Sequence, residues 1–284
     1  MKTLLLGSEG LLGSDLEKIF SSDYNVTSFV RKNLDITDEK EVLQKIEEIK
    51  PRIIINAAGY TAVDNAENEK DLAMAVNGHA VGYLAKAARE VNALLVHYST
   101  DYVFSGDKEE GYLEDDAPAE VPSTVYGQSK LLGEQELQKN IDKYYLIRTS
   151  WVFGSGGKDF IDTMIRLASE RDELKVVNDQ HGKPTYAPDL AKATQNLIES
   201  DSPFGIYHLT NEDDITWYEY AKKIVGKYGS IKGWGKKEFP HIIPVTSGEF
   251  STPAKRPNWS ILLNTKFSHL RPWSEALDEY LNLL

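Results

Sequence analysis

Two side chains capable of acid–base chemistry stand four residues apart in the segment VYGQSKLLGEQ, residues 125–135. Tyr126 supplies a phenol and Lys130 an ammonium group, and positions i and i+4 of a helix lie on one face. A phenol ordinarily has a pKa of about 10, too high for efficient proton transfer near neutrality. A neighbouring ammonium favours the phenolate and lowers that pKa. The pair therefore predicts a proton donor, although the same spacing also arises by chance from a surface tyrosine and a surface lysine.

A hydroxyl-rich strand end upstream supplies the third group that such chemistry needs. The apolar segment ALLVHYST, residues 93–100, ends in Ser99 and Thr100, and Asp101 follows. The carboxyl ends of parallel strands form the ligand-binding edge of an open α/β sheet. A hydroxyl at this edge can donate to a substrate carbonyl oxygen, which suits the reduction of a carbonyl beside a nicotinamide. The alternative is that both hydroxyls only satisfy backbone groups at the strand end.

A glycine-rich turn at the start of the chain is typical of a dinucleotide site. The segment GSEGLLG places Gly7, Gly10 and Gly13 after an apolar strand and at the start of an amphipathic helix. Glycine lets the backbone approach a pyrophosphate, and the helix N-terminus presents free N–H groups, here those of Leu11 and Leu12. The spacing GxxGxxG in this strand–helix context is the one used by short-chain dehydrogenase/reductases, and it favours a bound dinucleotide over a simple strand end.

The residues after the second predicted strand concern the choice of cofactor. An acid at this place binds the free 2′-hydroxyl of the adenosine ribose, whereas an arginine accommodates a 2′-phosphate. The sequence has Arg31 and Lys32 there, and its first acid is Asp35, followed by Ile36 near the adenine. This pattern predicts NADPH. The alternative is a solvated basic pair in a loop.

The third predicted strand ends in small residues that leave room for a ligand. Ala57, Ala58 and Gly59 close this strand and Tyr60 follows, so we expect all four beside the cofactor. A tightly packed turn is the alternative. Asn77 lies inside the next predicted helix, residues 69–91, where it is either exposed or braces the neighbouring strand.

The elements that position these groups alternate between short apolar segments and longer amphipathic ones. This alternation predicts an α/β fold, a Rossmann-type doubly wound parallel sheet with helices on both faces. We assign residues 1–150 to a dinucleotide-binding Rossmann domain. The pattern loosens from residue 151, and residues 151–284 are expected to form mainly a smaller α/β substrate-binding lobe, with some segments returning to the Rossmann sheet.

Composition narrows the classes of partner. The 284 residues carry a net charge of −12, which disfavours a nucleic-acid partner. The absence of cysteine excludes disulfides and thiolate chemistry and fits a cytoplasmic protein. No apolar run is long enough for a membrane span. The six histidines are scattered without ligand spacing, so no catalytic metal is predicted.

The chain resembles the extended short-chain dehydrogenase/reductases, specifically the dTDP-4-dehydrorhamnose reductases, over nearly its whole length. The most specific matching segments are STDYVF, RTSWVFG and DQHGKPTYAPDLA, beside GSEGLLG and VYGQSKLLGE. The resemblance implies reduction of a 4-keto dTDP-sugar to dTDP-L-rhamnose, with NADPH preferred and NADH also accepted, by a monomer or homodimer. It assigns the catalytic roles to Thr100, Tyr126 and Lys130, of which Tyr126 and Lys130 also bind cofactor. Ser99 then belongs to the cofactor site, and the sugar is expected to face Thr100, Asp101, Tyr102, Tyr126 and Trp151.

Two departures from the family and two rival functions stay open at this point. Glu9 stands where the family usually has Asn or Thr, and an acid beside a pyrophosphate is unfavourable unless it points away. Asp15 replaces a longer acid that holds magnesium between subunits in some members, so an interface magnesium is left open. The rivals are another nucleotide-sugar reductase or epimerase, and a non-catalytic relative like the β subunit of methionine adenosyltransferase. Trp151 is either a sugar contact or a core anchor for the lobe.

Overall fold

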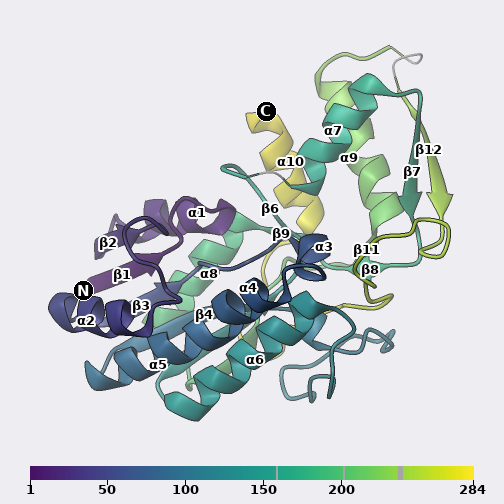
Figure 1. Ribbon diagram of the computed structural model, residues 1–284. Coiled ribbons are helices and arrows are strands. Elements are labelled where there is room, and N and C mark those ends of the chain that lie inside the picture. The colour runs from purple at the N-terminus through teal and green to yellow at the C-terminus, as the bar shows by residue number, and fades with distance from the viewer. Residues whose placement is uncertain (158, 201, 236–238) are drawn as a thin grey trace.

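A six-stranded parallel sheet forms the centre of the molecule, whose computed structural model describes residues 1–157, 159–200, 202–235 and 239–284. The strand order is β10-β5-β4-β3-β1-β2 (Figure 1). The order reverses between β1 and β3, and ligands of open α/β sheets bind at the carboxyl end of such a switch point. The strands are β1 (Lys2–Leu6), β2 (Asn25–Phe29), β3 (Ile53–Asn56), β4 (Leu94–Thr100), β5 (Tyr144–Thr149) and β10 (Gly205–His208).

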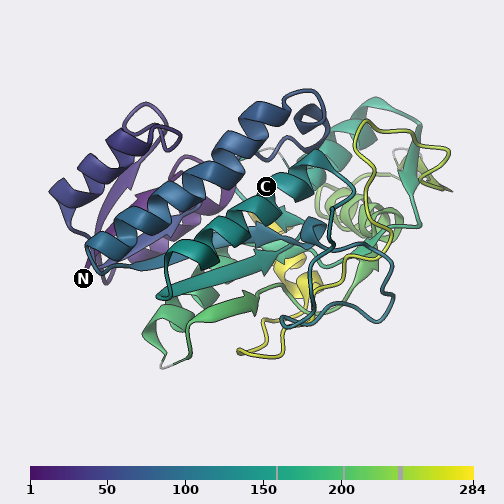
Figure 2. The same cartoon turned by 60° about the horizontal axis from the view of Figure 1, so that its bottom comes forward.

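Helices cover both faces of this sheet because its strands are apolar on both sides. Leu4 and Leu6 of β1 belong to one core with α2 (Glu39–Ile49) and α5 (Ala80–Glu90), whereas Leu5 belongs to the other. Figure 2 shows α2, α5 and α6 (Val125–Asn140) side by side over the first face, in agreement with their contacts. On the second face lie α1 (Leu11–Phe20) and α8 (Ala187–Glu199). The predicted Rossmann-type doubly wound sheet is confirmed.

The long helix predicted for residues 69–91 contains an irregular turn that sequence periodicity did not indicate. The structure has α4 (Lys70–Met74), a π-helical turn η1 (Ala75–His79) and then α5, and the short α3 (Val63–Ala66) precedes them. π-turns inside helices frequently mark functional sites. Asn77 lies in this turn and is fully buried. The alternative of an exposed asparagine is therefore wrong.

The C-terminal lobe stands at the carboxyl end of the sheet and has its own aromatic-rich core. Figure 1 shows α7, α9, β7 and β12 projecting beyond the sheet there. The segment 187–208 interrupts the lobe in sequence, since α8 packs on the sheet and β10 pairs with β5. The lobe elements are β6 (Val152–Phe153), α7 (Phe160–Glu170), β7 (Glu173–Val177), β8 (His181–Gly182), β9 (Thr185–Tyr186), β11 (Ile215–Thr216), α9 (Trp217–Ile231), β12 (His241–Val245) and α10 (Trp273–Leu283).

Neither a membrane-spanning helix nor a metal-binding cluster is present among the described residues. None of the helices in those ranges combines the length and apolar character needed to cross a membrane. Nor do the described residues contain a group of three or more His, Asp or Glu side chains that could hold a metal ion.

Candidate active site

The glycine turn brings the ends of β1 and β3 into contact. Gly7 has φ +83, and a Cβ added to it would lie 2.6 Å from the backbone nitrogen of Ala58. Only glycine fits a left-handed conformation at this distance from another backbone. The Gly10 nitrogen donates to the Gly7 carbonyl over 3.0 Å, and Gly10 is the N-cap residue of α1 without a capping side chain. Glu9 is exposed, so its carboxylate lies in solvent. The turn therefore offers an uncovered helix N-terminus that suits an anion.

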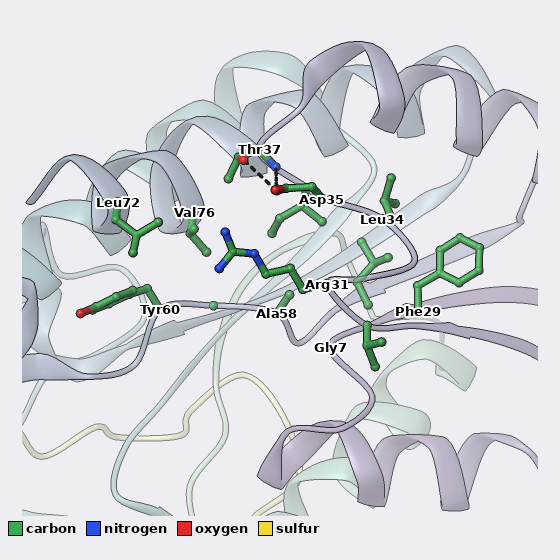
Figure 3. A pocket seen from close by; sticks show the side chains of 14 residues that line it. Gly7, Phe29, Arg31, Leu34, Asp35, Thr37, Ala58, Tyr60, Leu72 and Val76 are labelled. Atoms are coloured by element: carbon green, nitrogen blue, oxygen red, sulfur yellow. Dashed lines mark hydrogen bonds between the residues drawn. The ribbon is translucent and has the colours of Figure 1, made fainter. Parts of the chain in front are cut away.

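A cavity of about 180 Å³ lies beside this turn at the carboxyl ends of β1, β2 and β3 (Figure 3). Apolar side chains form most of its wall, as expected for a site that receives an aromatic base. Seven of the predicted cofactor residues line it: Gly7, Arg31, Asp35, Ile36, Ala58, Gly59 and Tyr60. Its wall is completed by Leu6, Phe29, Val30, Leu34, Thr37, Leu72 and Val76, which the sequence did not single out.

Two charged residues, Asp35 and Arg31, line this cavity, and they differ in how their side chains are held. One carboxylate oxygen of Asp35 accepts hydrogen bonds from the Thr37 nitrogen at 3.0 Å and the Thr37 hydroxyl at 2.7 Å. These bonds, and then the charge of Arg31, hold the pKa of Asp35 below its usual value. Figure 3 shows the Arg31 side chain extending across the cavity from the turn that follows β2. Lys32, its neighbour, is exposed and does not line the cavity.

The other seven predicted cofactor residues do not line this cavity: Gly10, Leu11, Leu12, Ala57, Ser99, Tyr126 and Lys130. Leu12 and Ala57 pack against the second core, so only their backbone faces the turn. Ser99 is buried and its hydroxyl donates to Glu134 Oε1 over 2.6 Å. The Ser99 hydroxyl is thus engaged by a buried carboxylate, and its place in the cofactor site stays a prediction.

The three predicted catalytic side chains are buried together where β4 meets α6. Thr124 caps α6 by accepting from the Gly127 nitrogen at 2.9 Å, which places Tyr126 and Lys130 on the first two turns. The Thr100 side chain lies close to the Tyr126 phenol. Thr100 Oγ1 also donates to Asp101 Oδ1 over 2.8 Å.

Lys130 lies between this group and the first cavity. Its Nζ donates to the Tyr98 carbonyl over 2.8 Å. A Cβ added to Gly59, which lines the cavity, would lie 3.7 Å from the same Nζ. The ammonium group is therefore fixed by β4 at the edge of the nucleotide cavity.

Burial dominates the protonation of these groups. Burial raises the pKa of the Tyr126 phenol, the Asp101 charge raises it further, and the Thr100 hydrogen bond opposes both. Burial also lowers the pKa of Lys130 to about 8, against the raising effect of Glu134. The expectation that Lys130 lowers the pKa of Tyr126 is wrong for this structure, since burial raises that pKa and Lys130 is not among the groups that lower it. The phenol is consequently protonated at neutral pH, the form that a proton donor requires.

Asn77 connects the first cavity to the helix that carries Tyr126. Its Oδ1 accepts from the Tyr60 nitrogen at 2.8 Å, and its Nδ2 donates to the Tyr60 carbonyl at 2.9 Å and to Ser129 Oγ at 3.0 Å. Ser129 precedes Lys130 on α6. Asn77 thus braces the end of β3 against α6, as one of the two alternatives for this residue predicted.

A second cavity of about 680 Å³ is lined almost entirely by residues of the lobe, and Asp64 of α3 completes its wall. Trp217 contributes an aromatic face, and Arg171, Lys175 and Arg256 contribute cations. Arg256 forms a two-pronged ion pair with Asp64 of α3, with nitrogen–oxygen distances of 3.0 Å and 2.7 Å. The two partners are 192 residues apart, so the pair joins the domains. The spacing of apolar residues along the sequence could not predict this ion pair. Arg256 does lie in TPAKRPNWS, one of the segments that resemble the family.

Tyr126 lies between the two cavities. The Tyr102 ring meets it edge-on at 5.6 Å, and Tyr60 of the first cavity packs in the same cluster. Tyr102 in turn lies close to Arg256 of the second cavity. The phenol is thus one side chain away from each cavity, which suits a proton donor placed between two bound molecules.

Trp151 does not line either cavity. Its ring stacks on Trp217 with centroids 3.4 Å apart and planes 8° apart. A Cβ on Gly182 would lie 2.5 Å from the Trp151 ring, so β8 passes directly against it. Trp151 therefore supports Trp217 from behind, and Trp217 forms the wall.

The comparisons with known proteins were made on the whole chain. The family model described as the RmlD substrate binding domain matches residues 1–284. A dTDP-4-dehydrorhamnose reductase of Burkholderia thailandensis is 38% identical, with 93% of this chain and 91% of that protein covered. The spore coat polysaccharide biosynthesis protein SpsK of Bacillus subtilis is 39% identical over 99% and 96% of the two chains.

Solved structures agree with the sequence relatives. The crystal structure of a dTDP-4-dehydrorhamnose reductase from Bacillus anthracis in complex with NADP superposes with a TM-score of 0.91 at 39% identity, and each chain is covered completely. The resemblance drawn from the sequence motifs is confirmed. The chain belongs to the family of the RmlD substrate binding domain, the family of the dTDP-4-dehydrorhamnose reductases.

Proposed function

We propose that this protein reduces the 4-keto group of dTDP-4-dehydro-L-rhamnose to give dTDP-L-rhamnose, with NADPH as the reductant. The observation that carries this proposal is the position of Tyr126, buried and protonated between a nucleotide-sized cavity and a larger cavity that contains cations. Relatives of 38% identity are named as dTDP-4-dehydrorhamnose reductases, which supports the choice of sugar.

The proposed cofactor site fits NADPH. The helix N-terminus at Gly10, Leu11 and Leu12 suits the pyrophosphate, and Gly7 lets the turn pack directly against the backbone of Ala58. Bound NADPH supplies the hydride. We assign the adenosine end to Arg31, Asp35 and Ile36, and the central part to residues 57–60, with Ser99 restricted to a backbone contact. The related Bacillus anthracis enzyme holds NADP, which supports this assignment.

The proposed catalytic roles follow from the hydrogen bonds. Tyr126 delivers its phenolic proton to the carbonyl oxygen as that oxygen becomes an alkoxide. Thr100 orients the same oxygen, and Lys130 holds the ribose hydroxyls and balances the phenolate that forms. NADH is expected to serve as a weaker alternative cofactor.

We place the sugar nucleotide in the second cavity, so that residues 151–284 act mainly as the substrate-binding lobe. Asp101 and Tyr102 adjoin Tyr126 and are proposed to contact the sugar. The role of Trp151 as a sugar contact stays a prediction, and the stacking on Trp217 favours an indirect role. The diphosphate requires cations, for which Arg256 is the best placed because its guanidinium adjoins Tyr102.

Arg31→Ala is expected to weaken NADPH binding ten- to a hundredfold while NADH binding changes by less than threefold. A charge-assisted contact to phosphate contributes roughly 1.5–3 kcal/mol, and NADH lacks that phosphate. Dissociation constants from fluorescence titration of both cofactors check the prediction. Lys32→Ala is the matched control, because this neighbouring cation is exposed and lies outside the cavity. Equal losses for both cofactors would remove Arg31 from the 2′-phosphate site.

Arg256→Ala is expected to raise the KM for the sugar nucleotide at least tenfold and to leave the Kd for NADPH unchanged. The variant removes the proposed cation for the diphosphate and leaves the first cavity intact. Steady-state kinetics, together with inhibition by dTDP and by thymidine, separate the diphosphate from the base. Lys255→Ala, at the adjacent exposed lysine, serves as the control. An unchanged KM in the Arg256 variant would place the diphosphate elsewhere.

The decisive test of the proposed function is NADPH oxidation with dTDP-4-keto-6-deoxy-L-lyxo-hexulose, run in parallel with NADH. We expect stoichiometric consumption of NADPH and formation of dTDP-L-rhamnose. An epimerase of the same fold would instead retain its cofactor without net oxidation. A non-catalytic relative would bind NADPH and show no turnover, and either result would overturn the proposal.

We further propose that the protein works in the cytoplasm, as a monomer or homodimer, and without a nucleic-acid partner. The net charge of −12 supports the last point, since an acidic surface repels phosphates. Magnesium between subunits is not part of the proposal.

A further inference from the structure

A buried ion pair lies directly behind the catalytic helix. Glu134 follows Lys130 by one turn of α6, and its two carboxylate oxygens accept from Arg148 of β5 at 3.0 Å and 2.7 Å. Both side chains are only 1% exposed. The Ser99 hydroxyl, next to Thr100 on β4, adds a hydrogen bond of 2.6 Å to the same carboxylate. Glu134 is therefore held rigidly from two strands.

Fold stability alone gives a poor explanation for this pair. Removing two charges from water costs several kcal/mol per ion, and apolar side chains of similar size are often as stabilising or more so. The pair is also incompletely satisfied, because Arg148 Nη1 has no hydrogen-bond partner among the described residues. The guanidinium instead rests 4.9 Å from the centre of the Phe104 ring. A buried pair retained under these conditions suggests a role beyond packing.

The groups around Lys130 indicate that the Glu134 carboxylate acts on this lysine. Burial lowers the pKa of Lys130, and the Glu134 carboxylate is the charge that opposes this effect. The other groups facing the lysine are neutral at physiological pH. Tyr126, one turn earlier on α6, has a raised pKa, and His97 of β4 has a pKa well below its usual value. From the remaining elements come the Tyr98 carbonyl and Gly59, and Asn77 adjoins Gly59 from η1.

We propose that Glu134, fixed by Ser99 and Arg148, is a positioning residue that keeps Lys130 protonated within the active site. It acts as the buried counter-charge of the lysine and does not touch substrate or cofactor. This inference rests on the proposed function, because it assumes that the Lys130 ammonium holds the ribose and balances the Tyr126 phenolate. It also explains why Ser99, at the ligand edge of β4, faces away from the cofactor.

The test is the pH dependence of a Glu134→Gln variant. Loss of the carboxylate lowers the pKa of Lys130, so the lysine becomes neutral at a lower pH. The protonated form is the active one, and the alkaline limb of kcat/KM should therefore move down by about one pH unit. The expected loss is about tenfold on the alkaline side and less than threefold near pH 6. Glu136→Gln, at a half-buried acid on the same helix, should keep the wild-type profile.

A second variant addresses folding, because Glu134→Gln leaves Arg148 buried without its partner. Glu134→Leu combined with Arg148→Met replaces the pair by apolar side chains, which usually preserves stability. We expect this double variant to fold and to show an alkaline shift in the same direction, smaller than that of Glu134→Gln because the Arg148 cation is removed together with the carboxylate. A folded double variant with the wild-type pH profile would overturn the proposal and leave the pair a purely structural feature.

A direct titration of Lys130 separates this inference from the proposed function. The ¹³C or ¹⁵N chemical shift of the labelled lysine side chain gives its pKa without any turnover. A lower pKa in both variants than in the wild type supports the counter-charge role even if the sugar substrate is wrong. An unchanged pKa refutes the role even if the enzyme reduces the expected sugar.

Discussion

Tyr126→Phe is expected to lower kcat by about 10²–10⁴-fold while the Kd for NADPH changes by less than threefold. The substitution removes the proton donor and keeps the ring that packs against Tyr102 and Tyr60. Burial raises the pKa of the phenol, so it stays protonated well above neutral pH. An alkaline loss of activity is therefore expected to follow Lys130, whose pKa is about 8, and not Tyr126.

The measurement is single-turnover reduction of the 4-keto sugar, with cofactor binding measured separately. Tyr24→Phe is the matched control, because Tyr24 is also buried and hydrogen-bonded, to Glu199 at 2.9 Å, but packs in the core under α1 and α8. The control should turn over at the wild-type rate. If Tyr126→Phe retained activity within a factor of a few, another group would have to be the acid.

Gly13→Ala is expected to reduce the free energy of unfolding by about 2–3 kcal/mol and to weaken NADPH binding more than tenfold. A Cβ at this position would lie 1.9 Å from the Gly7 carbonyl oxygen and 2.8 Å from its carbon. Both atoms belong to the backbone of the turn, so α1 and β1 must separate. The N–H groups at the start of α1 then lose their alignment with the pyrophosphate site.

Gly10→Ala is the control that shows whether a steric clash causes the losses expected in Gly13→Ala. The nearest atom to a Cβ on Gly10 is the Gly7 carbonyl oxygen at 3.3 Å, and the backbone there is extended with φ −77. Chemical denaturation should show this variant within about 1 kcal/mol of the wild type. If the two variants were equally stable, close packing of α1 on the turn would not be what holds the site together.

The local parts of the molecule could be predicted from the sequence. β1, the glycine turn and α1 are consecutive, and their pattern of apolar residues and glycines is sufficient to specify a strand, a tight turn and a helix. The spacing of Tyr126 and Lys130 is likewise local, since a helix alone places them on one face. Arg31 follows β2 directly, and the geometry of a parallel sheet then carries it to the nucleotide cavity.

The same local patterns could not predict properties of the site that depend on burial. The sign of the Tyr126 pKa shift is set by desolvation, which depends on how Tyr102, Tyr60 and the lobe close around it. The π-turn at Asn77 was not predicted, because one extra residue in a helical turn barely changes the spacing of the apolar residues along the sequence. The hydroxyl of Ser99 could not be assigned, because its partner Glu134 lies 35 residues later in the chain.

The sequence by itself determined the fold class and the family, and it singled out the candidate reactive side chains, because these depend on residue types at fixed short spacings. Tertiary structure alone decided which side chains share an environment. It paired Arg256 with Asp64 across 192 residues, stacked Trp151 behind Trp217, and buried Glu134 with Arg148 behind Lys130. Such contacts arise when separate segments exclude water from one another, and the energy of a charge or a ring then depends on all its neighbours at once. The amino-acid sequence lists the residues, but it does not show which of them exclude water from one another in the folded protein.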